Sequence, residues 1–255
     1  MVRGSGLRTG LGVDIGGSGI KGAPVDLAGG AFAADRVRQE TPQPSTPAAV
    51  APVVADVIAG FDVPADTPVG ITFPAVIQHG IARTAANVDT SWIGTDAGTL
   101  FCETLGRKVL VVNDADAAGY AEVVFGAGKG VRGVVLVTTL GTGIGSALFV
   151  DGRLVPNTEF GHLEIDGHDA EKKAADSARE RHDLSWSQWA KRLQRYYSHV
   201  ENLLWPDLIV VGGGVSKKHE KFLPHLDLRT PIVPAQLRND AGIIGAAMLA
   251  ADLVG

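Results

Sequence analysis

The sequence predicts an α/β protein of two related lobes with a ligand cleft between them. Strand pairs alternate with helices along the 255 residues, an order typical of α/β folds. Each half opens with two apolar segments around a turn rich in glycine and Ser or Thr: DIGGSG at 14–19 and TLGTGIG at 139–145. A chain of this length can bury a sizeable core in one large domain or two modest ones.

The first half is expected to form four strands and one helix. LGVDI is an apolar run typical of a buried strand, and the glycine turn after it predicts a hairpin. Proline is tolerated near a helix start, so PAAVAPVVADVIAG predicts a helix. The expected strands cover 11–15, 20–27, 32–39 and 68–75, and the helix covers 47–60.

The second half continues with longer helices. The apolar residues of WSQWAKRLQRYYSHVENLL recur at helical spacing, which predicts an amphipathic helix. The expected strands are 107–114, two within 131–155, and 206–211, and the expected helices are 117–128, 169–204 and 241–253. We expect a small lobe over 9–112, with the C-terminal helix 241–255 packing back on it, and a large lobe over 113–240.

Composition excludes several classes of protein. The net charge of −5 gives no global basic field, so no nucleic-acid partner is expected. No apolar run reaches the roughly 18 residues of a membrane span, and the N-terminal segment lacks the apolar core of a signal peptide. The single cysteine, Cys102, rules out an intrachain disulfide and indicates a cytoplasmic protein.

The glycine-rich turns predict phosphate binding. GGSGIKG contains G-x-G-x-x-G, but the dinucleotide fingerprint requires a helix next, and IKGAPVDL favours a strand. GAGKGVR lacks the Ser or Thr of a P-loop. One such turn alone is more often a plain tight turn. Three of them, at 16–19, 139–145 and 212–216, indicate backbone N–H groups that cradle phosphate, with Lys21 adding charge and Asp14 holding hydrated Mg²⁺.

The segment VLVVNDADAAGYAE places an amide and a carboxylate, those of Asn113 and Asp114, at the end of a strand. Asn or Asp often caps a helix there, and we expect Asp116 to take that role. Asn113 and Asp114 would then be free to face a ligand. Because an alcohol that attacks phosphorus must lose its proton, Asp114 is the candidate general base.

The chain resembles the ROK sugar kinases in an ordered set of motifs: DIGGSGIKG, NDADA, LGTGIGSALFVDGRLVPNTEFGHLE, LIVVGGGVS and AGIIGAA. The resemblance covers about residues 9–250 and is closest to the polyphosphate glucokinase branch, through TFPAVIQHG, TSWIG and the W-S-x-W-A run. It implies the two-lobed actin-like (ribonuclease H-like) ATPase fold. It also implies transfer of phosphate to the 6-hydroxyl of glucose, or of mannose, with Mg²⁺ as cofactor.

The resemblance assigns roles to single residues. The residues it implies for binding the phosphoryl donor are Asp14, Gly16, Gly17, Ser18 and Lys21 in the first loop and Thr139, Gly141, Thr142 and Gly143 in the second. Those it implies near the distal end of the donor are Gly212, Gly213 and Gly214. The residues it implies for binding the sugar are Asn87, Asn113, Asp114, Glu159, His162 and Glu171, with Asp114 as general base.

One departure from the family concerns zinc. In many of these proteins the His of the E-x-G-H motif also binds zinc with three cysteines that follow it, and residues 163–181 contain none. A structural zinc site needs about four N or S ligands, so no zinc is expected. We expect Glu164 or Asp166 to orient the His162 ring instead, through a hydrogen bond.

The residues alone leave the donor open between inorganic polyphosphate with ATP and ATP alone, and the resemblance to the polyphosphate glucokinase branch favours polyphosphate with ATP. A polyphosphate groove needs a row of cations, for which Lys217, Lys218 and Lys221, with Lys129 and Arg132, are candidates. A sugar-responsive regulator would need a helix-turn-helix before the first strand, and an actin-like scaffold would have no use for the sugar residues. The aromatic helix residues Trp186, Trp189, Tyr196 and Tyr197 are expected in the core or in a homodimer contact.

Overall fold

The computed structural model describes residues 9–254 and divides them into two compact units. Unit 1 is the chain up to Ala121 together with the chain from Asp240 on, and unit 2 is Glu122–Asn239. The sequence placed this boundary at 112–113. Helix α3 (Asp114–Val124) begins in unit 1 because Gly245 packs directly on it: a Cβ there would lie 1.8 Å from the Ala117 carbonyl oxygen.

Unit 1 is built on one sheet with the order β3-β2-β1-β5-β8, and β4 also pairs with β2. The hairpin β1–β2 is antiparallel, whereas β1, β5 and β8 run parallel. The single strand expected over 32–39 is two short strands, because both pair with β2 and the chain bends between them. The strands are β1 Thr9–Ile15, β2 Ile20–Asp26, β3 Ala31–Phe32, β4 Val37–Gln39, β5 Val69–Phe73 and β8 Val109–Asn113.

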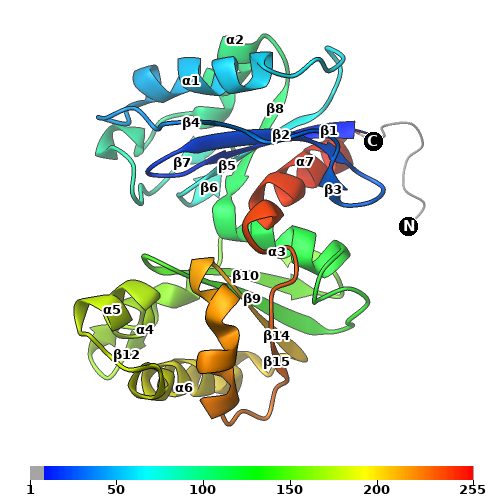
Figure 1. Cartoon of the computed structure of the whole chain (residues 1–255). Helices are drawn as coiled ribbons and strands as arrows, with labels where there is room; N and C mark the ends of the chain where they lie inside the picture. Colours follow the sequence, from blue (N-terminus) through cyan, green and yellow to red (C-terminus); the bar gives the residue numbers. More distant parts are fainter. Residues whose placement is uncertain (1–8, 255) are drawn as a thin grey trace. The chain divides into compact units, whose positions relative to one another are not determined.

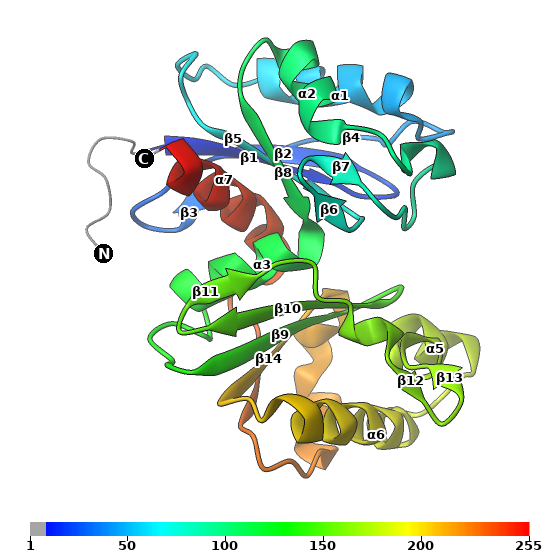
Figure 2. The same ribbon diagram turned by 180° about the vertical axis from the view of Figure 1, so that it is seen from behind.

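Helices cover both faces of this sheet. In Figures 1 and 2, α1 (Pro47–Ala59) and α2 (Ala97–Leu105) lie on one face and α7 (Ala241–Val254) on the other. Glycine lets α7 approach closely, since a Cβ on Gly70 would lie 1.9 Å from the Ala246 carbonyl oxygen. Helix α2 was not expected from the sequence; Asp96 caps it.

Unit 2 repeats the plan of unit 1 with the sheet β11-β10-β9-β14-β15. Again the first two strands form an antiparallel hairpin, and β14 runs parallel to β9 and β15. The repeat of one sheet order in both units bears out the relation suggested by the two glycine turns. The strands are β9 Val134–Leu140, β10 Ile144–Val150, β11 Arg153–Val155, β14 Leu208–Gly212 and β15 Ile232–Pro234.

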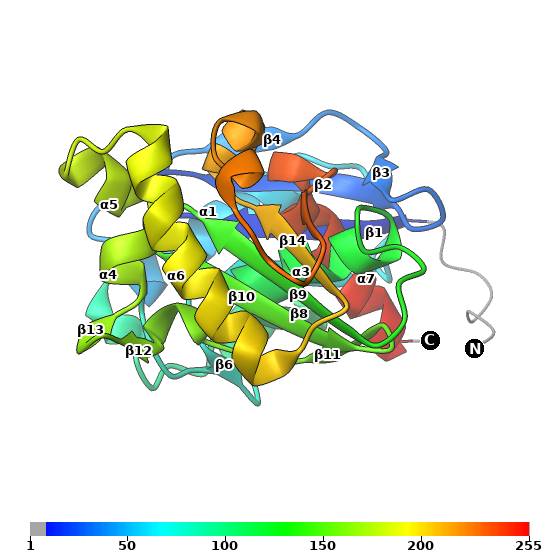
Figure 3. The ribbon, with the colours of Figure 1, turned by 90° about the horizontal axis from the view of Figure 1, so that it is seen from below.

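The helical segment expected over 169–204 is three helices, α4 (Glu171–Ala174), α5 (Asp176–Arg181) and α6 (Trp186–Leu204). Ala175 is extended between the first two, and α6 starts with a capping box at Ser185. Figure 3 shows α6 crossing the sheet of unit 2. Its Trp189, Tyr196 and Tyr197 are buried against that sheet, which confirms the core assignment.

Short elements complete both units. Unit 1 also contains the hairpin β6 (Ile77–Gln78) and β7 (Ile81–Ala82), and unit 2 contains the hairpin β12 (Glu164–Ile165) and β13 (His168–Asp169). The 3₁₀ turns are η1 Thr90–Trp92, η2 Phe160–His162, η3 Gly214–Lys221, η4 Leu223–His225 and η5 Arg238–Asp240. Across residues 9–254, no helix combines the length and the apolar character that a membrane crossing demands.

Candidate active site

In the first glycine loop, three consecutive carbonyl groups face the segment 38–43. The carbonyl oxygens of Gly16, Gly17 and Ser18 accept hydrogen bonds from the side chains of Thr41, Gln43 and Arg38. In a trans peptide the next N–H points the opposite way, so the N–H groups of residues 17–19 face away from those side chains. This is the geometry of an anion cradle.

Asp14 lies at the end of β1, directly before this loop. Its Oδ1 accepts a hydrogen bond from Thr72 Oγ1 at 2.7 Å, and its Oδ2 lies 3.7 Å from Lys21 Nζ. The first turn of α7 also approaches the carboxylate, since a Cβ on Gly242 would lie 3.8 Å from Asp14 Oδ1. One partly exposed carboxylate fits a magnesium ion that keeps most of its waters and is bound mainly by substrate phosphate.

The pair at the end of β8 is arranged differently from the expectation. Asn113 Oδ1 accepts from the N–H groups of Ala115 and Asp116, at 2.9 and 3.1 Å, so Asn113 is the residue that caps α3. The prediction that Asp116 caps the helix was wrong, because the amide reaches two N–H groups from the position before the first turn. Asn113 Nδ2 also donates to the Ala75 carbonyl at 3.0 Å. The fixed amide sets the position of Asp114, the next residue.

Asp114, Asp14 and the first loop belong to one edge of the sheet. Asp14 pairs with Thr72 across β1 and β5, and Phe73 pairs with Asn113 across β5 and β8. Carboxyl ends of parallel strands are where α/β proteins bind ligands. Asn87 lies beside this edge with a φ of 60°, and a Cβ on Gly17 would be 2.9 Å from its carbonyl oxygen.

The second glycine loop repeats the arrangement of the first. The carbonyl oxygens of Gly141 and Thr142 accept from the N–H and the hydroxyl of Ser177, at 3.1 and 2.6 Å. The N–H groups of Thr142 and Gly143 therefore face away from α5. Nothing lies within 4 Å of a Cβ placed on Gly141, so the space at the loop surface is open.

The third glycine loop lies beside the second, because Gly212 pairs with Thr139 in the parallel strands β14 and β9. Gly213 has a φ of 81°, and a Cβ there would lie 2.2 Å from the Leu140 carbonyl oxygen. Gly214 has open space around it. A cavity of about 420 Å³ adjoins this loop, lined by Ala127, Ser216, His219, Val233, Pro234, Ala235, Gln236 and Arg238.

The carboxylates and imidazole of the E-x-G-H segment form one cluster. His162 Nε2 lies 3.9 Å from Glu159 Oε2, and His162 Nδ1 lies 4.0 Å from Glu171 Oε1 and 3.0 Å from Asp169 Oδ2. Burial raises the pKa of Glu159 above its usual range. The hydrogen bond to Asp169 raises the pKa of His162, with Glu171 and Glu159 adding to it. Four polar groups thus converge where a polyol can be held.

Asp169 orients the ring, and the expectation that Glu164 or Asp166 does so was wrong. Asp166 forms a bidentate ion pair with Arg195, at 2.6 and 3.0 Å. Asp166 and Gly167 have φ of 55° and 73°, a type I′ hairpin turn that pairs Glu164 with Asp169. The dipeptide D-G between two short β segments was the signal in the sequence for this hairpin, and hence for Asp169.

Three of these groups offer ligand atoms to a cation. Atoms of His162, Asp169 and Glu171 all lie within 4.8 Å of one another. Two carboxylates and one imidazole are one ligand short of a structural zinc set. Glu171 Oε2 already accepts from the Ile144 N–H at 3.0 Å.

Cations gather near the third loop, around the indole of Trp186. Arg179 Cζ lies 4.3 Å from the ring centroid, and Lys218 Nζ and Lys221 Nζ lie at 5.7 and 5.6 Å. Lys218 and Lys221 belong to the predicted row of cations. Arg179 was not foreseen, because the charged segment around it is typical of a solvated helix face.

Comparison with known proteins gives consistent matches. Residues 10–174 match the model of the ROK family. A polyphosphate glucokinase from Mycobacterium tuberculosis (strain CDC 1551 / Oshkosh) is 53% identical over 242 residues, which is 94% of this chain and 91% of that protein. The crystal structure of an inorganic polyphosphate/ATP-glucomannokinase from Arthrobacter sp. strain KM is 58% identical, with a TM-score of 0.91 over 95% of this chain and 98% of that one. A ROK glucokinase from Streptomyces griseus, with a TM-score of 0.78 at 24% identity over 95% of this chain and 99% of that one, shares the fold.

Proposed function

This chain belongs to the ROK family, and we propose that it is a polyphosphate glucokinase. It transfers a phosphoryl group from inorganic polyphosphate, or from ATP, to the 6-hydroxyl of glucose, and it accepts mannose as a second hexose. The support is the match to a polyphosphate glucokinase and to a polyphosphate/ATP-glucomannokinase over nearly the whole chain.

Glu159, His162, Asp169 and Glu171 are called the sugar cluster below. The contact between this cluster and the second glycine loop is the observation that best supports the proposal. Glu171 accepts a hydrogen bond from the Ile144 N–H, and a Cβ on Gly143 would lie 2.3 Å from its Oε2. The residues that suit a polyol and the N–H groups that suit phosphate are therefore neighbours within unit 2. A phosphotransferase needs its acceptor and donor in such contact.

Asp114 is the proposed general base. The carboxylate stands at the first position of α3, where the cap by Asn113 fixes the chain. A carboxylate that takes the proton of the 6-hydroxyl makes that oxygen the better nucleophile toward phosphorus. Asp114 belongs to unit 1.

The sugar cluster supplies selectivity for hydroxyl groups. Glu159 accepts from hydroxyls through a partly buried carboxylate, and His162 exchanges a further hydrogen bond through Nε2 while Asp169 holds Nδ1. A site built to pair with hydroxyls rejects analogues that lack them, because its buried polar groups would remain unpaired.

Asp14 is the residue proposed to hold Mg²⁺ through water. When bound, this ion neutralises negative charge on the transferring phosphoryl group. The outward N–H groups of the first loop stabilise phosphate oxygens of the donor, and Lys21 adds a positive charge beside Asp14.

Groups near the third glycine loop suit the binding of both donors, polyphosphate and ATP. Lys218 and Lys221 beside Trp186 suit the repeated charge of polyphosphate, which has no base or ribose to recognise, whereas Arg179 is paired with Asp176 and Glu180. The cavity of about 420 Å³ beside Ser216 is in the size range of small-ligand pockets and suits a nucleoside. The alternative is a kinase that uses ATP alone.

The decisive experiment measures glucose 6-phosphate with Mg²⁺, comparing nucleotide-free polyphosphate with ATP. Asp114→Asn should lower turnover with both donors by about 10²–10⁴-fold without changing the circular dichroism spectrum. Lys218→Gln/Lys221→Gln should raise KM for polyphosphate more than for ATP, with the exposed Lys108→Gln as control. Product from ATP alone would select the alternative, and absence of hexose phosphorylation with either donor would refute the proposal.

A cytoplasmic location and a homodimer are also proposed. A cytoplasmic setting is supported by the single cysteine, Cys102. For a homodimer, three of the four aromatic side chains that suggested it, Trp189, Tyr196 and Tyr197, are buried in unit 2, so an interface would have to use exposed groups such as Leu203 and Trp205.

A further inference from the structure

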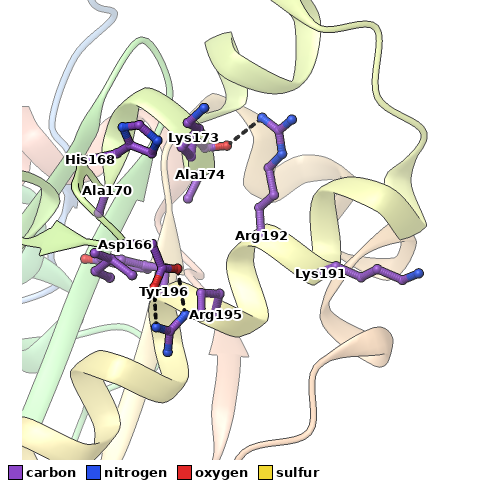
Figure 4. A pocket seen from close by; sticks show the side chains of 10 residues that line it. Asp166, His168, Ala170, Lys173, Ala174, Lys191, Arg192, Arg195 and Tyr196 are labelled. Carbon is purple, nitrogen blue, oxygen red and sulfur yellow. Dashed lines mark hydrogen bonds and ion pairs between the residues drawn. The ribbon is translucent and has the colours of Figure 1, made fainter.

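A second pocket opens in unit 2 on the side of the hairpin β12–β13 that carries Asp166 and His168. Its volume is about 390 Å³, and α4 and α6 form its other walls. Ile165, Ala170, Ala174 and Tyr196 provide apolar lining. Figure 4 shows the polar side chains around this lining, among them Lys173, Arg192 and Arg195.

The polar lining carries surplus positive charge. Asp166 is the one carboxylate in the lining, and the bidentate contact with Arg195 satisfies it. Arg192 Nη1 donates to the Lys173 carbonyl oxygen at 3.2 Å, which brings the guanidinium beside α4. Neither Lys173 nor Arg192 forms an ion pair with any residue in the described range 9–254. Lys191 also lines the pocket without an ion pair in that range, so three positive charges remain without a counter-ion in a chain whose net charge is −5.

We propose that this pocket is a phosphate-binding site separate from the three glycine loops. A phosphate monoester carries nearly two negative charges at neutral pH, which suits a pocket lined by uncompensated cations. A guanidinium binds two phosphate oxygens at once, and a nearby ammonium adds a point charge. The ring of Tyr196 and the two alanines offer an apolar surface for the organic part of such an ester. The volume is also in the range of small-molecule sites.

The pocket shares its walls with the sugar cluster. His168 precedes Asp169, which holds the His162 ring, and Lys173 lies in the same short helix as Glu171. An anion bound between α4 and α6 therefore contacts the elements that position two sugar-site residues. Any coupling between anion and hexose binding would be reciprocal.

The test is calorimetric titration of the full chain with three probes: inorganic phosphate, glucose 6-phosphate and tripolyphosphate. Lys173→Gln/Arg192→Gln should weaken one class of sites about tenfold, because it removes charge-assisted hydrogen bonds to the anion. Lys172→Gln is the control: it removes one charge from α4, the helix of Lys173, but the exposed Lys172 does not line the pocket. The control should change affinity less than about twofold.

The three probes identify the source of the phosphate. Tightest binding of glucose 6-phosphate indicates that the organic part packs on Tyr196, tightest binding of tripolyphosphate indicates a chain segment, and equal binding indicates phosphate alone. Unchanged affinities in Lys173→Gln/Arg192→Gln would overturn the site, as would an equal loss in Lys172→Gln. The double variant should keep the melting temperature and glucose turnover of the parent. Loss of turnover together with binding would place these cations in the donor site and refute a separate one.

Discussion

Replacing Asp169 by asparagine tests how the sugar cluster is held. The change preserves side-chain shape and removes the charge from the 3.0 Å contact between Asp169 Oδ2 and His162 Nδ1. A hydrogen bond to a charged partner is worth about 1 kcal/mol more than a neutral one. Because the His162 ring is half exposed to solvent, we expect the effect to be no larger than this difference. A loss of about 1 kcal/mol in hexose binding corresponds to a roughly fivefold rise in KM for glucose.

The pH profile separates an orienting role from a merely structural one. The carboxylate of Asp169 raises the pKa of His162, so its removal should shift the histidine ionisation in the profile of kcat/KM toward lower pH. A histidine whose pKa is raised in the folded state stabilises the fold fully below its unfolded pKa of about 6.5, and this is lost as pH rises through the folded pKa. Asp169→Asn should therefore lower the melting temperature more at pH 5.5 than at pH 8.

Steady-state kinetics between about pH 5.5 and 8.5 and thermal unfolding at both ends of this range provide the measurements. Glu164→Gln is the matched control, since Glu164 is exposed and pairs with Asp169 across the same hairpin. If Asp169→Asn leaves KM and the ionisation where they are, or if the control reproduces its effects, then Asp169 does not orient His162.

Three other substitutions test separate parts of the argument. Gly141→Ala fills open space in the second loop, so it should leave the melting temperature unchanged and raise KM for the phosphoryl donor; unchanged donor kinetics would show that phosphate does not approach there. Glu159→Gln should raise the melting temperature at pH 8, because burial raises the pKa of Glu159 and its ionised form destabilises the fold above that pKa, and it should also raise KM for glucose; a lower melting temperature would contradict this. Gly70→Ala places a Cβ 1.9 Å from the Ala246 carbonyl oxygen and should cost about 1–3 kcal/mol in urea unfolding; a smaller loss would mean that α7 can shift.

Local pattern in the sequence is enough to predict the two related hairpins and most of the major elements. Apolar runs and glycine turns act over a few residues, so the segments 14–19 and 139–145 can be matched to each other from their residues alone. Elements with weaker local signals were missed: α2, and the breaks that divide 169–204 into three helices.

The hydrogen-bond and ion-pair partners of individual polar side chains could be identified only from the tertiary structure. Spacing favoured Asp166 for His162, but the type I′ turn directs Asp166 to Arg195, which follows 29 residues later, and brings Asp169 to the ring. Asn113 likewise caps α3 while its amide reaches Ala75 on a neighbouring segment.

The sequence by itself thus determined the two glycine-turn hairpins and most of the long strands and helices, because those depend on backbone preference and periodic burial. Only the tertiary structure decided which carboxylate holds His162, which cations surround Trp186, and that Glu171 joins the sugar cluster to the second loop. These contacts join residues distant in sequence, and their energies depend on distances of a few ångströms that no residue pattern specifies.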